Sequence, residues 1–185
     1  MPISRPQKFG KSLNISMAKK FLDIRESNSN DLFSGTDIMD DSLFVQANMQ
    51  KHPVISIKLP RSLQRVKSFE KWRDNIKEYF GELSDTFFDC LKDVDKMEPV
   101  EVLNCIVDFL FKDNGEREVI ILIDNFEYPL VAALKGGIIN EAYEFYGKSV
   151  FPASLVSNKK ILKIVSIGML QIEIPGSIYS LDCLK

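Results

Sequence analysis

Apolar runs of strand length alternate along this chain with amphipathic stretches of helix length. Residues 54–59 predict a strand that Pro60 closes, and residues 119–123, Val-Ile-Ile-Leu-Ile, are an apolar run bounded by charged residues. Such a run is typical of a strand that is buried on both faces of a parallel sheet. A third, mostly apolar run covers residues 164–172. Strands that alternate with helices favour βαβ units, so the pattern predicts an α/β fold whose mainly parallel sheet carries helices on both faces.

Apolar residues spaced three and four apart predict the helices between these strands. A short helix is expected at residues 41–49, and another is expected to begin at Pro99, because proline is favoured in a first turn. Residues 69–80 predict an amphipathic helix that stops near Gly81 and continues as a second piece. Its aromatic stripe could bind a partner, but packing in the core is the favoured interpretation. The pair Gly136-Gly137 is interpreted as a connector before a further helix.

The segment from Arg5 to Ser12, Arg-Pro-Gln-Lys-Phe-Gly-Lys-Ser, matches part of a phosphate-binding loop. Such a loop, the Walker A motif, needs inward-facing N–H groups, a lysine for the β- and γ-phosphates and a hydroxyl for Mg²⁺. The pattern G-x-x-x-x-G-K-[ST] usually supplies them. Gly10, Lys11 and Ser12 fill its last three positions, and Arg5 stands where the first glycine is usual.

A helix is predicted to start directly after this loop. Leu13, Met17, Phe21 and Ile24 recur at spacings of four, four and three residues, which predicts the buried face of that helix. A helix N-terminus is a favourable place for a phosphate group. The candidate nucleotide-binding residues are the charged residues and backbone N–H groups of this segment: Arg5, Lys8, Phe9, Gly10, Lys11 and Ser12.

The apolar run at residues 119–123 ends in Asp124, in the manner of a Walker B strand. In open α/β sheets, ligands bind beside the carboxyl ends of the strands, so Asp124 and the Ser12 hydroxyl are the candidate ligands of Mg²⁺. An ordinary buried strand, whose aspartate caps the next turn, is the alternative interpretation.

These residues also resemble a known family. Arg-Pro-x-x-Phe-Gly-Lys-Ser, followed by Leu-x-x-Ser-Met, is similar to the opening of the AAA-ATPase-like proteins that are often fused to a nuclease domain, in which arginine also replaces the first glycine. The resemblance continues at residues 32–35, 52–57 and 122–130 and covers nearly the whole chain. It implies a P-loop NTPase-like three-layer fold that binds ATP and magnesium.

Several positions depart from that family pattern. Asn125 stands where the family has the glutamate that would activate water, and an amide can hold a water but cannot accept its proton. Ile167 and Gln171 stand at a threonine and an arginine of the family. The catalytic candidates are therefore Asn125 and Glu127, and Glu127 qualifies only if the turn carries it inward.

Two functional interpretations stay open. The first is an ATP- and Mg²⁺-binding module with weak or absent hydrolysis. The second is a non-catalytic remnant of the same fold that acts as a scaffold for a protein partner or for self-association. Whether the chain is an enzyme is left undecided by these residues.

The start of the chain predicts an incomplete domain. Residues 1–4 alone precede Arg5, and an ordinary strand has about five or six residues. The sequence therefore predicts a single AAA-ATPase-like domain over residues 1–185 that is incomplete at its N-terminus, with a loop that has no strand to anchor it.

The composition and charge of the chain limit the functions and the cellular locations that it can have. With 185 residues, 45% of them hydrophobic, and a net charge of −2, the chain can bury one core and gives no sign of direct nucleic-acid binding. A basic group at Lys58, Arg61, Arg65 and Lys67 is interpreted as solvated surface. Neither a signal peptide nor a membrane-spanning run is apparent, and three widely spaced cysteines fit a reducing compartment. The sequence therefore predicts a soluble intracellular protein, in the cytoplasm or the nucleus.

Overall fold

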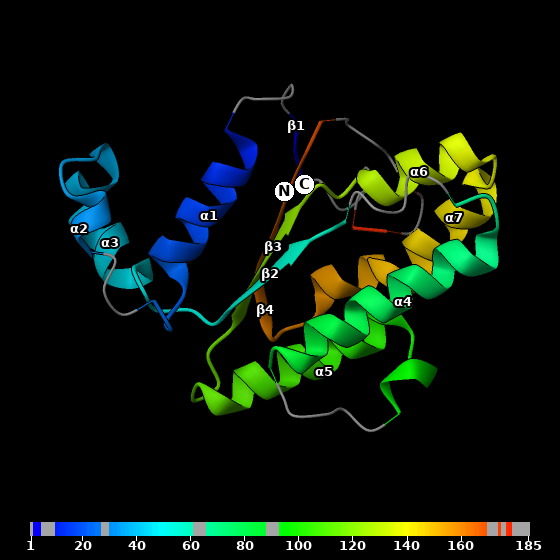
Figure 1. Cartoon of the computed structure of the whole chain (residues 1–185). Helices are drawn as coiled ribbons and strands as arrows, with labels where there is room; N and C mark the ends of the chain where they lie inside the picture. The colour runs from blue at the N-terminus through cyan, green and yellow to red at the C-terminus, as the bar shows by residue number, and fades with distance from the viewer. Residues whose placement is uncertain are drawn as a thin grey trace.

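The computed structural model describes residues 2–4, 10–26, 30–60, 66–87, 93–169, 174 and 177–178. Within these residues the chain forms an α/β fold around a four-stranded sheet in the order β1-β4-β3-β2, and each pair of neighbouring strands is parallel (Figure 1). The strands are β1 (Pro2–Ser4), β2 (Val54–Lys58), β3 (Val119–Asp124) and β4 (Ile161–Gly168). The parallel arrangement is confirmed, and β2 and β3 lie at the predicted positions. The third run was predicted at residues 164–172, whereas β4 begins at Ile161 and ends at Gly168, and residues 170–172 lie outside the described residues.

Helices cover both faces of this sheet and complete three layers. One face carries α1 (Lys11–Leu22), and the other carries α4 (Phe69–Asp85), α5 (Pro99–Asp113), α6 (Tyr128–Gly136) and α7 (Ile139–Phe145) (Figure 1). Two short helices, α2 (Asn30–Phe33) and α3 (Ser42–Asn48), follow α1 and lie beside it away from the sheet. Short 3-10 or π turns occupy Asp37–Asp40, Val94–Lys96, Tyr146–Val150 and Ala153–Ser157.

The alternation of side chains along β3 explains why this strand reads as a continuous apolar run. Val119, Ile121 and Ile123 face the large core under α4 and α5, whereas Ile120 and Leu122 face α1. Successive residues of a strand point to opposite faces, so a strand covered on both faces has no polar positions. All six residues of β3 are buried.

The helix α1 begins at the expected lysine, but its predicted buried face is only partly right. Phe21 is buried, as predicted, in a cluster with Phe33 and Met49. Leu13 and Met17 are 63% and 44% exposed. The helix lies on the sheet through Ile15, with Ala18 and Leu22 packed beside it. These residues are also spaced three and four apart, so the sequence contained two competing faces, and contact with the sheet selected the second.

The helix α4 is continuous through Gly81, whereas the sequence analysis expected two pieces. Trp72, Ile76, Phe80 and Ser84 recur every four residues and are all buried, so one face packs along the whole helix. A glycine inside a helix lowers helix propensity by about 1 kcal/mol relative to alanine, and this packing outweighs that cost. The aromatic stripe lies in the core, as the favoured interpretation expected.

Strand β1 gives the loop segment a short strand before it, which the sequence analysis did not expect. Pro2, Ile3 and Ser4 pair with β4, and Ser4 lies opposite Gly168. The last residues of β1 and β4 therefore lie side by side at the same edge of the sheet.

Candidate functional site

The candidate site lies where the carboxyl ends of the parallel strands meet the N-terminus of α1. The register places Lys58 of β2 opposite Asp124 of β3, and Asp124 opposite Ile167 of β4. These strand ends form a row across the sheet, because neighbouring parallel strands run in the same direction about 4.8 Å apart. Ligands of open α/β sheets bind at such a row of strand ends.

The N-terminus of α1 has the features of an anion site. Gly10 precedes the helix with φ of +68°, a left-handed conformation that glycine adopts readily. Among the described residues no side chain caps this end, and the first turn contains no acidic residue. The first N–H groups of a helix have no partner within the helix and carry partial positive charge, so this end favours a phosphate group.

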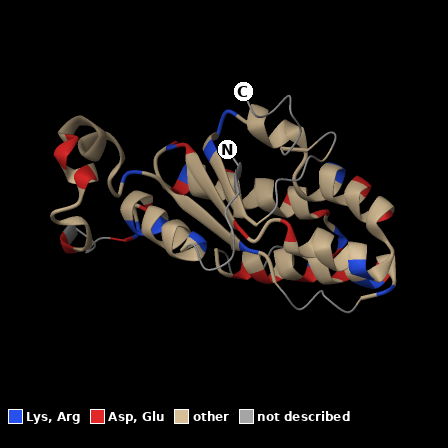
Figure 2. Ribbon diagram, turned by 90° about the horizontal axis from the view of Figure 1, so that it is seen from above, with Lys and Arg blue, Asp and Glu red and all other residues tan. Residues whose placement is uncertain are grey.

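Lys11 and Ser12 open α1 as predicted, directly after Gly10. Lys11 is half-buried and Ser12 is exposed. Arg5, Lys8 and Phe9 lie outside the described residues, as does Gln171. Lysine residues on α1 lie beside the sheet, as Figure 2 shows.

Asp124 is buried at the end of β3 and carries an oxygen with no hydrogen-bond partner. Its side chain is 3% exposed, and its Oδ1 accepts no hydrogen bond from the described residues. A buried carboxylate oxygen without a partner costs free energy unless a cation or a donor satisfies it. The described residues contain no cluster of three histidine, cysteine or acidic side chains that could hold a metal ion by themselves. Mg²⁺ commonly takes one or two carboxylates and completes its shell with phosphate oxygens and water, and Asp124 fits that mode.

Asn125 follows Asp124 in a left-handed conformation. Its φ is +61°, a region in which asparagine is better tolerated than most residues. Its N–H donates a hydrogen bond of 3.0 Å to the carbonyl of Ile167, which fixes the turn to the end of β4. The residue is 7% exposed and contributes to the wall of a pocket described below.

Glu127 is carried inward by the same turn and is completely buried. Its Oε1 accepts a hydrogen bond of 2.9 Å from the N–H of Met169, whereas its Oε2 has no hydrogen-bond partner in the described part of the chain. Burial raises the pKa of this carboxyl, and the charge of Asp124 raises it further, whereas the Met169 N–H and the charge of Lys11 lower it. Lys11, Asp124 and Glu127 are therefore close enough to interact electrostatically.

Gly168 is the residue that makes room for Glu127. A Cβ atom at this position would lie 2.3 Å from Glu127 Oε2 and 2.4 Å from Cε1 of the Phe126 ring. Any side chain at residue 168 would overlap these atoms. The backbone at the end of β4 therefore packs directly against Phe126 and Glu127 of the turn after β3.

A pocket of about 320 Å³ opens between the start of α1 and the strand ends. Its walls are formed by Ser12, Lys58, Leu59, Pro60 and Asn125. The volume is at the lower end of the range that ligand sites occupy, about 300 to 1,000 Å³. Ser12 and Asn125, predicted from positions more than a hundred residues apart, therefore lie at one hollow.

Lys58, Leu59 and Pro60 line the pocket but were not predicted as site residues, and Lys58 is the charged one among them. It was assigned to a solvated basic group, together with Arg61, Arg65 and Lys67. The signal that could have identified it is the one that identified Asp124, a polar residue at the carboxyl end of an apolar strand.

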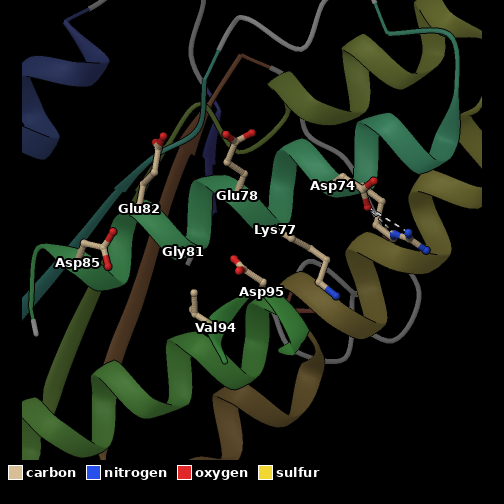
Figure 3. A pocket seen from close by; sticks show the side chains of 9 residues that line it. Asp74, Lys77, Glu78, Gly81, Glu82, Asp85, Val94 and Asp95 are labelled. Carbon is tan, nitrogen blue, oxygen red and sulfur yellow. Dashed lines mark hydrogen bonds and ion pairs between the residues drawn. The ribbon is translucent and has the colours of Figure 1, made fainter. Parts of the chain in front are cut away.

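A larger hollow of about 630 Å³ lies between α4 and the turn Val94–Lys96, and its charges make it unsuitable for phosphate. Five acidic side chains line it, and its two cations are already paired, Arg73 with Asp74 and Lys77 with Glu98. Figure 3 shows the acidic side chains of α4 spread along the helix, without converging on one point. The lining residues are Arg73, Asp74, Lys77, Glu78, Gly81, Glu82, Asp85, Val94 and Asp95.

Comparison with known proteins identifies a family. A sequence model of the family AAA-ATPase_like, described as predicted AAA-ATPase, matches residues 1–176. Comparisons with curated proteins and with solved structures found no match. Among the helices of the described residues, none is both long enough and apolar enough to cross a membrane.

Proposed function

Because the chain belongs to the predicted AAA-ATPase family, we propose that it binds ATP with Mg²⁺ at the carboxyl ends of β3 and β4 and hydrolyses it weakly or not at all. One observation supports the binding most directly. The N-terminus of α1, which no described side chain caps, shares a pocket with Asn125 through Ser12. Asp124, the residue before Asn125, is buried and has an oxygen with no hydrogen-bond partner among the described residues. A phosphate chain with its metal ion would satisfy both groups at once.

The roles of the binding residues follow from their positions. Lys11 would contact the β- and γ-phosphates, and the N–H groups from Phe9 to Ser12 would surround them. The Ser12 hydroxyl and Asp124 would hold Mg²⁺, which neutralises the charge of the phosphates when it is bound. Arg5 and Lys8, which lie outside the described residues, are proposed to add positive charge to the loop.

Weak or absent hydrolysis is proposed from the two catalytic candidates. Asn125 lines the pocket and could hold a water molecule, but its amide cannot accept the proton. Glu127 can accept a proton, but it is fully buried and one of its oxygens already accepts a hydrogen bond from the Met169 N–H. Neither residue combines a free carboxylate with access to bound phosphate.

A protein-interaction scaffold is the second candidate, and the surface of α2 and α3 supports it. Leu32, Leu43 and Phe44 are 66%, 78% and 42% exposed. Apolar side chains that gather on a surface can mark a site of protein association. A scaffold of this kind would not depend on nucleotide.

Equilibrium binding of a fluorescent ATP analogue tests the proposal. We expect micromolar binding with Mg²⁺, a large loss with Lys11→Ala, and loss of the Mg²⁺-dependent part with Asp124→Asn. Lys71→Ala is the matched control, because Lys71 is exposed on α4 and outside the pocket. No saturable binding by a chain that circular dichroism shows to be folded would overturn the nucleotide proposal and leave the scaffold.

A further inference from the structure

We propose that Lys58 is a second phosphate-binding cation of this site and that it makes the site prefer a nucleoside triphosphate to a diphosphate. The inference rests on the proposed nucleotide binding and goes beyond it, because it assigns the contact with the terminal phosphate to a residue of β2.

The position of Lys58 supports this role. It is the last residue of β2 and lies opposite Asp124 in the register of the sheet. Its side chain is exposed and lines the pocket together with Ser12 and Asn125. The residue proposed to hold Mg²⁺ is therefore its neighbour on the next strand, and the start of α1 is across the pocket.

The backbone of Lys58 is fixed on both sides of β2. On the side of β3, the N–H of the following residue, Leu59, donates a hydrogen bond of 3.1 Å to the carbonyl of Asp124. On the other side, the N–H of Lys58 donates a hydrogen bond of 2.9 Å to the Tyr79 hydroxyl of α4. Burial raises the pKa of Tyr79, which keeps this hydroxyl neutral. A lysine on a fixed backbone loses less freedom when it binds than one on a mobile loop.

The charge of Lys58 is available to a ligand. In the described part of the chain its ammonium group forms no ion pair, in contrast to Lys77 and Lys160, which bond to Glu98 and Asp108. A hydrogen bond from an ammonium group to a phosphate oxygen is about twice as strong as one between neutral groups. A bound phosphate would give this charge a partner.

The order of the strands explains why the terminal phosphate is the one concerned. The sheet runs β1-β4-β3-β2, so Lys58 lies beyond Asp124 on the side away from β1, which precedes the loop. Neighbouring strands lie about 4.8 Å apart. A phosphate chain held at the start of α1 and bridged by Mg²⁺ at Asp124 would bring its last phosphate toward β2. A diphosphate lacks this last phosphate, and the proposed preference for a triphosphate follows from that difference.

Binding of matched fluorescent tri- and diphosphate analogues with Mg²⁺ tests the assignment. Lys58→Met removes the charge and keeps a long unbranched side chain, and Lys58→Arg keeps the charge. For Lys58→Met we expect the Kd of the triphosphate to rise about tenfold, the loss of one charge-assisted contact, with the Kd of the diphosphate changed less than about twofold. Lys58→Arg should retain most of the preference.

A control variant and the pattern of Kd values distinguish the role of Lys58 from nucleotide binding itself. Lys71 is exposed and lies outside the pocket, so Lys71→Met should leave both Kd values unchanged. If the wild-type protein binds both analogues equally, or if Lys58→Met changes neither Kd or both by the same factor, the role of Lys58 is overturned and nucleotide binding stands. If the folded wild-type protein binds neither analogue, both the inference and the proposed function are overturned.

Discussion

Replacement of Gly168 by alanine should destabilise the protein strongly for so small a change. The added Cβ would lie 2.3 Å from Glu127 Oε2, and 2.4 and 2.8 Å from Cε1 and Cδ1 of the Phe126 ring. Phe126 is 1% exposed and Glu127 is fully buried, so neither side chain can turn into solvent. Overpacking of this kind costs about 1 to 3 kcal/mol. Displacing Glu127 would also break its bond to the Met169 N–H, worth about 1 kcal/mol.

The expected loss is therefore about 2 to 4 kcal/mol in the free energy of unfolding. Gly81→Ala is the matched control, because its Cβ would lie 3.7 Å from Val94 Cγ1, an ordinary contact. Alanine inside a helix is favoured over glycine by about 1 kcal/mol. The same substitution should therefore have opposite signs at these two glycines.

Equilibrium denaturation by urea and thermal unfolding measure both effects. For a chain of this length, 1 kcal/mol shifts Tm by about 2 to 4 °C. We expect Gly168→Ala to lower Tm by about 4 to 16 °C and Gly81→Ala to raise it by about 2 to 4 °C. A Gly168→Ala protein as stable as wild type, or two variants with shifts of the same sign, would refute the packing described at the end of β4.

The remaining predictions concern buried polar groups and are read out by urea denaturation. Burial raises the pKa of Glu127 above its usual 4.5, so the stability that its protonated form contributes is lost as pH rises from there. The free energy of unfolding of Glu127→Gln should therefore rise relative to that of wild type as pH increases from 4.5 to 8. A difference between the two proteins that does not change with pH would contradict this prediction. Trp72→Phe removes the indole N–H that donates to the Pro129 carbonyl at 2.9 Å and should cost about 2 to 4 kcal/mol; an unchanged midpoint would count against that bond. Tyr146→Phe leaves the Phe126 carbonyl without its donor and should cost about 1 to 2 kcal/mol, a loss that Tyr143→Phe, which is only partly buried, should not share.

Local sequence determined the elements that carry the site. The apolar run that ends in Asp124 is buried on both faces, as its composition predicted, because only a strand covered on both sides needs no polar positions. The helix begins at Lys11, where a glycine suited to a left-handed conformation precedes it. The buried strand and the start of the helix depend on residues that are close in the sequence, so hydrophobic periodicity is enough to predict them.

Choices between equivalent local patterns required the tertiary structure. Both Leu13 with Met17 and Ile15 with Leu22 fit a helical face, and contact with the sheet decided between them. Gly81 could end a helix or continue it, and the packed face of α4 decided in favour of continuity. Local propensities differ by about 1 kcal/mol in such cases, less than the burial of one large apolar side chain.

The residues of the candidate site also fall into two groups, those that local sequence predicted and those that only the tertiary structure brings together. The sequence by itself made Lys11, Ser12 and Asp124 candidates for the site, because each belongs to a motif whose spacing is local. It could not place Lys58 in the pocket or Gly168 against Glu127, because strand order and register bring those residues together. Register depends on the packing of whole faces of the sheet, so it is settled only when the strands, the helices and the turns between them assemble.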